Sequence, residues 1–262
     1  MKKVLLTILT IAAMAACKKD DTICYNNITM GNVDGETIIS DQGNTFDITE
    51  SYYGDIDLSW FEYGRVMLNC DVLRKTAENR YDIRLTNIVS VLTKSVVKAS
   101  TITDPASEVA VKDAVNIREM WYSGGYLNIL IEFAVKYGSQ TKHLINLVHE
   151  DVQTAEDAAS ENKYEFTLRH NAFGEVPAED QLYETSLGYV SFPIASLITE
   201  DKASITIKWN SHKFDNGRYN YYESETVSEQ FNWERAGFEH KTGIVKSFTN
   251  PNQMLDKKIL AR

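Results

Sequence analysis

Apolar and polar side chains alternate with a period of two in short runs along most of the chain, and this alternation decides the fold class. In "RVMLNCDVL", Val66, Leu68 and Cys70 fall on one face of an extended chain, whereas Asn69 and Asp71 fall on the other. Similar runs follow at short intervals: "YDIRLTNIVSVL", "YLNILIEFAV", "KHLINLVHE", "YEFTLRHN", "GYVSFPIASL" and "SITIKWNS". Turn-forming residues separate them, so the sequence predicts an all-β protein built from barrels or sandwiches.

A break in the alternation at "ASTITDPASE" predicts a linker between two domains. We place the first domain at residues 30–107 and the second at residues 108–245, and we expect residues 246–262 to be a tail. In the first domain, "RKTAENR" predicts a polar hairpin connection, and the alternation weakens in the second domain after Asp215.

Glycines and small polar residues mark two further turns. Gly124-Gly125 predicts a hairpin formed by residues 117–122 and 126–137, in which Asn128 and Glu132 lie on the polar face. "DVQTAEDAASENK" is polar and rich in alanine, so we expect a loop or one short exposed helix there.

The N-terminus resembles the export signal of a bacterial lipoprotein. A cationic start precedes thirteen mostly apolar residues that end at Ala16, which is too short for a membrane span of about 20 residues. Cys17 follows small residues, as does the cysteine that is lipidated in such proteins. We therefore expect residues 1–16 to be a cleaved signal peptide and residues 17–29 to be a lipidated cysteine with its tether. "KKDD" after Cys17 resembles a surface-export signal of Bacteroidetes lipoproteins, so we expect an outer-membrane protein that faces the cell surface or the periplasm.

Charge and cysteine content narrow the partners and the compartment. The chain has 27 basic and 37 acidic side chains, a net charge of −10, and no basic cluster longer than a pair. Because such a surface repels phosphate, nucleic acid is excluded as a partner. Cys24 lies in the expected tether and Cys70 in a strand; the two could pair outside the cytoplasm, but the alternation favours a buried free thiol at Cys70.

Six blocks of the sequence resemble, in order, those of the NigD-like lipoproteins of Bacteroidetes: "YGRVMLNCDV", "YDIRLTNIVSVLTK", "MWYSGGYLNILIEF", "KHLINLV", "TLRHNAFGE" and "VSFPIASL". This resemblance implies an N-terminal OB-like barrel and a C-terminal β-sandwich behind a lipidated cysteine. The family takes its name from a bacteriocin-associated operon, and the resemblance supplies no catalytic residues.

The histidines do not follow a metal-binding pattern. His143 and His149 are six residues apart, roughly 20 Å along an extended strand, which is too far for one ion. His170 shares a strand face with Tyr164 and Phe166, so we expect a core histidine with a hydrogen-bonded ring. No HExxH, CxxC or GxSxG motif occurs, and we predict a protein with no metal, no cofactor and no catalytic activity.

Two aromatic segments are candidates for binding. "WYSGGY" places Trp121, Tyr122 and Tyr126 around a hairpin turn, where rings can stack on sugars or anchor a protein. The alternative is that Trp121 closes one end of the sandwich core while the tyrosines pack across the strands. "RYNYYESETVSEQFNWE" adds Tyr221, Tyr222 and Trp233. It is equally compatible with an edge hairpin whose rings cover the sandwich.

Three hypotheses on function follow. The first is a non-catalytic, lipid-anchored envelope protein that binds a macromolecular or glycan partner at the outer membrane. The second is a bacteriocin-associated immunity or accessory lipoprotein, suggested only by the name of the family. The third is a hydrolase that uses two carboxylates in a groove, for which the sequence shows no signature.

Overall fold

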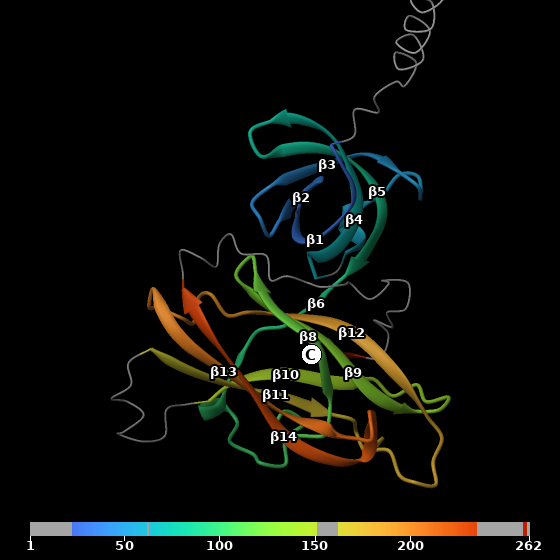
Figure 1. Ribbon diagram of the computed structural model, residues 1–262, viewed down its shortest axis with the longest axis vertical. Helices are drawn as coiled ribbons and strands as arrows, with labels where there is room; N and C mark the ends of the chain where they lie inside the picture. The colour runs from blue at the N-terminus through green and yellow to red at the C-terminus, as the bar shows by residue number, and fades with distance from the viewer. Residues whose placement is uncertain (1–22, 62, 151–161, 235–258, 261–262) are drawn as a thin grey trace, which may run out of the picture.

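The computed structural model describes residues 23–61, 63–150, 162–234 and 259–260 (Figure 1). These residues are mostly strands, with two short 3-10 helices, η1 (Leu58–Trp60) and η2 (Ala99–Thr101). The predicted all-β fold is confirmed. Residues 1–22, which hold the expected signal peptide and Cys17, lie outside the described residues, as does the predicted loop or helix at 151–161.

Five strands close into a barrel in the order β1-β2-β3-β5-β4. They are β1 (Cys24–Asp34), β2 (Thr37–Ser40), β3 (Thr45–Ser51), β4 (Arg65–Ala77) and β5 (Arg80–Ser90). β3 and β5 are parallel, and the other neighbours are antiparallel. This five-stranded closed barrel is the OB-like domain that the resemblance implied.

The alternation in β4 fills the barrel. Val66, Leu68 and Cys70 point into a core that also contains Ile38 and Leu85. Cys70 is fully buried and free, and burial raises the pKa of its thiol to about 11. The prediction of a buried free thiol is therefore confirmed, and Cys24 is a free, exposed cysteine.

Three predicted boundaries in the first half are wrong. Cys24 lies in β1 and pairs with Val72 of β4, so the tether predicted at residues 17–29 overlaps a barrel strand. The hairpin between β4 and β5 turns only at Glu78 and Asn79, because solvent on both faces lets polar residues extend these strands. The first domain also ends well before residue 107, since the chain joins the second domain from Leu92 onward.

The second domain consists of two facing sheets. One has the order β6-β12-β9-β8 and the other the order β14-β13-β11-β10-β15, with β7 also paired to β10. The strands of the first are β6 (Leu92–Thr93), β8 (Asn116–Ser123), β9 (Tyr126–Lys136) and β12 (Tyr183–Pro193). Those of the second are β7 (Val97–Lys98), β10 (His143–His149), β11 (Lys163–Asn171), β13 (Lys202–Asp215), β14 (Arg218–Glu234) and β15 (Ile259–Leu260).

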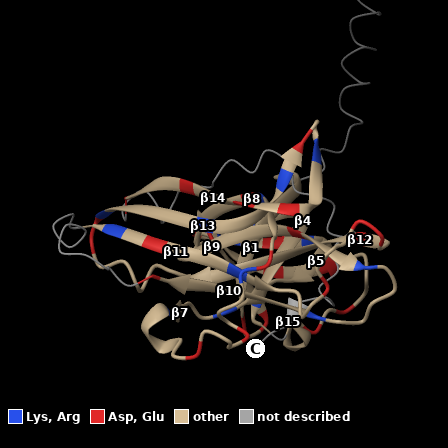
Figure 2. Cartoon of the chain, turned by 90° about the horizontal axis from the view of Figure 1, so that it is seen from below, with Lys and Arg blue, Asp and Glu red and all other residues tan. Residues whose placement is uncertain are grey.

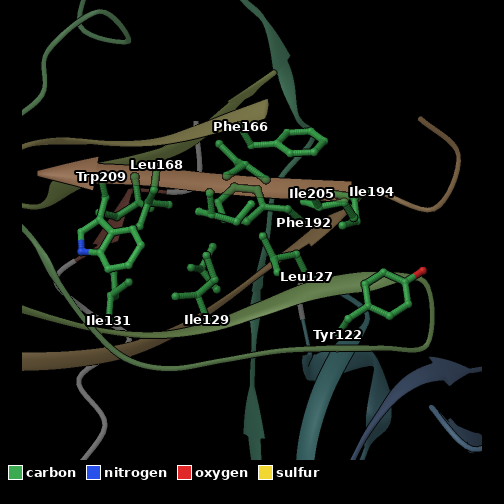
Figure 3. Packing of buried hydrophobic residues seen from close by; sticks show 14 of the residues in the cluster. Tyr122, Leu127, Ile129, Ile131, Phe166, Leu168, Phe192, Ile194, Ile205 and Trp209 are labelled. Atoms are coloured by element: carbon green, nitrogen blue, oxygen red, sulfur yellow. The ribbon is translucent and has the colours of Figure 1, made fainter. Parts of the chain in front are cut away.

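Alternating residues of both sheets form the sandwich core (Figure 3). Ile129 and Ile131 of β9 face Phe166, Leu168 and Trp209 of the other sheet. The hairpin predicted around Gly124-Gly125 is confirmed as β8 and β9. The pattern that weakens after Asp215 nevertheless forms β14, because it pairs with β13 along most of its length.

The barrel rests on the outer face of the four-stranded sheet, next to β6, β8 and β12 (Figure 1). Met30 and Met67 of the barrel pack there against Leu130 and Tyr189 of the sandwich. For this reason Asn128, expected on a polar face, is fully buried.

The surface charges are mixed. In Figure 2, which colours the backbone by residue type, Lys and Arg positions are interspersed with Asp and Glu positions along the strands. Among the described residues, none belongs to a helix that is long and apolar enough to cross a membrane.

Candidate functional site

The tip of the β8–β9 hairpin is part of the contact between the two domains. Arg65 of the barrel is 1% exposed; its guanidinium donates to the Asp41 carboxylate at 2.8 and 2.9 Å and to Asn128 Oδ1 at 2.9 Å. Its Nε donates to Ser191 Oγ at 3.0 Å, and Ser123 at the tip also donates to Asp41. The polar groups at this contact are therefore organised around a buried ion pair.

The aromatic residues of this tip pack within the protein. Tyr126 lies under Arg65, with 4.0 Å between the guanidinium carbon and the ring centroid. Trp121 contacts the ring of Tyr189 edge to face, and Tyr122 is buried in the sandwich core. Tyr122 lies at the end of the core layer drawn in Figure 3. The three rings thus pack internally, but not as the alternative has it: Tyr122 lies at the end of the sandwich core, and Trp121 packs at the contact with the barrel.

Trp233, the last aromatic candidate of the second segment, is also a core residue. It is 2% exposed and packs edge to face on Tyr122, with ring centroids 4.7 Å apart. Its position late in β14 places it on the inward face of that strand, with Phe231 two residues before it.

Tyr221 and Tyr222 lie at the other end of β14, where the strand departs from regular pairing. His212 pairs with Ser224, but the next residue, Lys213, pairs with Asn220, so residues 221–223 are skipped in the strand pairing. Such bulges re-aim side chains and are common beside functional sites. This one turns Tyr221 inward and leaves Tyr222 44% exposed.

The bulge brings together a set of rings that we call the tyrosine surface: Tyr183, Phe214, Tyr219, Tyr221 and Tyr222. The ring centroids of Tyr183 and Tyr221 are 5.0 Å apart, and those of Phe214 and Tyr219 are 5.2 Å apart. Phe214 is 59% exposed. The rings come from β12 and from both strands of the β13–β14 hairpin, so they form one continuous patch.

A buried carboxylate holds the tyrosine surface in place. Glu132 of β9 is 4% exposed and accepts hydrogen bonds from Tyr221 at 3.1 Å and from Asn116 at 3.2 Å. Arg118 of β8 donates to it from two nitrogens and also lies over the Tyr219 ring, 5.0 Å from its centroid. Both carboxylate oxygens therefore have partners, and Glu132 tethers a hairpin of one sheet to the other sheet.

His212 lies directly beneath this surface. Its ring centroid is 4.7 Å from that of Tyr221, and it is 3% exposed. Burial lowers the pKa of His212 to about 4, against the opposing effect of the Glu132 carboxylate. Burial likewise raises the pKa of Tyr221 to about 12, so both groups are neutral at pH 7.

The other buried histidines form a pair in the sandwich. His170 Nδ1 is 2.8 Å from the Ala114 carbonyl oxygen, which can only accept, so this nitrogen carries the proton. His143 Nδ1 then donates to His170 Nε2 at 2.9 Å. Burial lowers the pKa of His170 to about 3. The predicted core histidine with a hydrogen-bonded ring is confirmed.

The described residues contain no group of three or more His, Cys, Asp or Glu side chains suited to a metal ion. The nearest acidic group to the pair, Glu175, is 3.6 Å from His143 Nε2, and burial of this pair among Phe133 and other core residues suits a structural role.

Sequence reasoning missed Arg118, Glu132 and Tyr183. Glu132 was assigned to a solvated strand face, because its spacing from Asn128 matches ordinary alternation. One signal was available: Glu132 is the single charged residue in the apolar run "LNILIEFAV", where a strand that is buried on both faces needs a partner for it.

The comparisons with known proteins agree with this architecture. The family model described as "NigD-like C-terminal beta sandwich domain" matches residues 98–223. The chain carries a NigD-like C-terminal β-sandwich domain. This domain contains Arg118, Glu132 and Tyr221, and the resemblance drawn from the sequence is confirmed. The comparison with curated proteins found no match.

Several solved structures share the two-domain fold. A protein of unknown function from Bacteroides vulgatus has a TM-score of 0.57 at 17% identity, over 89% of this chain and 99% of that one. A NigD-like immunity protein from Bacteroides caccae has a TM-score of 0.54 at 17% identity, over 81% and 97%. A candidate lipoprotein from Bacteroides fragilis has a TM-score of 0.54 at 12% identity, over 80% and 98%. At these identities the likeness establishes the fold alone.

Proposed function

We propose that this chain is a non-catalytic, lipid-anchored protein of the outer membrane that binds a protein partner through the tyrosine surface. The observation that carries the proposal is the contrast between the two ends of the β13–β14 pair: Trp233 is buried at one end, whereas Tyr222 in the bulge and Phe214 on β13 are exposed at the other. Tyrosine and arginine are the residues that most often dominate protein–protein binding energies. The Glu132 network fixes these rings before binding, which lowers the entropic cost of association.

The anchoring part of the proposal rests on the N-terminal sequence. The apolar stretch, the small residues and Cys17 follow the pattern of a lipoprotein signal. Similarity to a candidate lipoprotein supports the same assignment. Intact cells treated with protease would lose the protein if it faces outward, and a Cys17→Ala variant would be released from the membrane fraction.

A photo-crosslinking experiment tests the binding surface. p-Benzoylphenylalanine replaces Tyr222 in one strain and Tyr25 in another, because Tyr25 is an exposed ring, 52% accessible, on strand β1 of the barrel. We expect a discrete protein adduct from position 222 and none from position 25. The adduct should disappear when Tyr183→Ala removes the neighbouring ring. No adduct at 222, equal adducts at both positions, or an adduct that carries only glycan would refute the proposal.

A second candidate is immunity against a bacteriocin, which would be one specific case of protein binding. It is favoured by the similarity to a NigD-like immunity protein from Bacteroides caccae. Deleting the gene and challenging the cells with the matching toxin tests this candidate. Unchanged sensitivity would remove immunity and leave the binding proposal standing.

A further inference from the structure

A second surface, on the barrel and outside the NigD-like sandwich domain, has the features of a ligand site. A groove of about 790 Å³ runs between the β1–β2 turn, strand β3 and residues 54–59. Its size lies within the range of small-molecule sites, roughly 300–1,000 Å³. This inference is independent of the protein-binding proposal, because the two surfaces share no residue.

Three large aromatic side chains accompany the groove. Tyr52 and Tyr53 connect its wall residues Ser51 and Gly54, and Trp60 follows its last wall residue. They are 70%, 59% and 72% exposed, respectively. Large rings in solvent forgo the favourable free energy of burial, so three of them within residues 52–60 call for an explanation.

These rings are exposed on a segment whose other apolar residues are anchored in the barrel. Leu58 is buried in the barrel core, and Ile56 and Phe61 pack against the same core. Between these anchors, the 3-10 helix η1 is capped by Asp57, whose carboxylate accepts from the Ser59 amide at 2.9 Å. Since the smaller apolar residues are held inside, Trp60 is presented outward by a fixed backbone.

The polar groups of the groove restrict the ligand. Its lining includes the carboxylates of Glu36, Glu50, Asp55 and Asp57 and no lysine or arginine, which excludes phosphates and other anions. Glu50 is ion-paired with Arg84 at 2.6 Å. The groove therefore offers acceptor oxygens from its other carboxylates and from the hydroxyl groups of Thr49 and Ser59.

A neutral sugar matches this combination. The C–H face of a pyranose ring stacks on an aromatic ring, and its hydroxyl groups donate to carboxylates. We propose that the groove binds a neutral oligosaccharide, with Trp60 and Tyr52 as stacking platforms and Glu36 and Asp55 as acceptors for sugar hydroxyls. The site holds the sugar without cleaving it.

Two of these carboxylates argue against cleavage. A glycosidase needs one carboxyl group with a raised pKa as its general acid. In Asp57, the hydrogen bonds from Ser59 lower the pKa instead. Glu50 is engaged in its ion pair with Arg84. The groove thus contains acidic residues, as the hydrolase hypothesis requires, but two of the four are engaged in other contacts.

Affinity electrophoresis tests the site with defined probes. The full chain is run in native gels that contain laminarin, mannan, xylan or dextran, four soluble neutral polysaccharides. We expect retardation by at least one of them, unchanged when salt rises from about 0.05 to about 0.5 M, since no charge pair is involved. Trp60→Ala should weaken binding about tenfold or more, and Tyr137→Ala, a ring of matched exposure, should have no effect.

The same experiment contains the results that would overturn the proposal. These are no retardation by any of the four probes, equal retardation of Trp60→Ala, or retardation that is lost in salt. Release of reducing ends during incubation would overturn the non-cleaving role. Thermal unfolding of Trp60→Ala checks its fold, and a crosslink from position 222 is unaffected by any of these outcomes, so failure here and failure of the protein-binding proposal are distinguishable.

Discussion

Two hairpin tips of the same sandwich carry almost the same aromatic chemistry and end in opposite environments. The β8–β9 tip places Tyr122 and Tyr126 in the core and in the contact with the barrel. The β13–β14 tip leaves Tyr222 and Phe214 largely in solvent. Composition and turn residues do not separate these cases; what separates them is which tip meets the other domain.

The difference shows how each tip is held. Arg65 and Asp41 form a buried ion pair at the first tip, so its position depends on the barrel. The second tip is tied to its own domain through Glu132 and Tyr221. The first tip therefore joins the domains, and the second presents its rings outward on a support of its own.

Replacing Arg65 should disrupt the contact between the β8–β9 tip and the barrel, and we expect this change to cause the largest loss of stability. Arg65→Ala leaves Asp41 as a buried charge without its partner, which typically costs about 3–5 kcal/mol. Urea unfolding measures the loss. Arg80→Ala is the control, because its ion pair with Asp47 is exposed to solvent and its loss should have a much smaller effect. Equal losses in the two variants would mean that the contact between the domains is not held by this pair.

Trp233→Ala should show whether the two ends of β14 have different roles, one in the core and one in binding. Truncating a buried tryptophan costs about 3–5 kcal/mol, and we expect a value near the lower limit because β14 is an edge strand that can relax. The thermal unfolding midpoint and the photo-crosslink from position 222 should be measured together. If Trp233 is only a core residue, stability falls while the crosslink persists in the folded fraction. A crosslink lost at full stability would instead make Trp233 part of the binding surface.

Much of the fold followed from the sequence because alternation responds directly to burial of one strand face. The core residues of β4 and the hairpin at Gly124-Gly125 were predicted correctly for this reason. The errors occurred where a second element covers a strand. Asn128 and Glu132 look like ordinary outward residues until the barrel and the β13–β14 tip are placed over them.

The binding surfaces were less predictable. Tyr221 and Tyr222 were identified from composition, but their partners Arg118 and Tyr183 come from strands distant in the sequence, and pairing across two sheets cannot be read from one segment. The aromatic residues beside the barrel groove were not singled out, because Trp60 lies among apolar anchors such as Leu58 and Phe61 in the sequence and resembles a core residue.

Acidification should weaken the second tip through His212. The folded state holds the pKa of this ring near 4, against an ordinary value near 6.5, so below pH 6.5 the unfolded chain binds a proton that the folded chain does not. The stabilising contribution of neutral His212 is therefore complete above pH 6.5, and it falls by about 1.4 kcal/mol per pH unit toward pH 4. His212→Asn should remove the His212 contribution to the slope of the free energy of unfolding against pH, measured by urea unfolding between pH 6.5 and 4.5. His170 contributes equally in the wild-type protein and in this variant. Identical slopes would show that His212 is not the titrating group.

Tyr222→Ala should have the smallest effect on stability, and it tests most directly whether the β8–β9 and β13–β14 tips differ. The ring is 44% exposed and lies in a bulge that is skipped in the pairing of β13 and β14, so its loss should change the free energy of unfolding by no more than about 0.5 kcal/mol. Its loss should nevertheless reduce partner capture, measured with the crosslinker moved to position 214 on the same surface. A stability loss above about 1 kcal/mol would mean that the second tip packs as tightly as the first, and the tyrosine surface would then be a structural element. A side chain that contributes little to folding while its neighbours are held rigid beneath it is what a preformed binding surface requires.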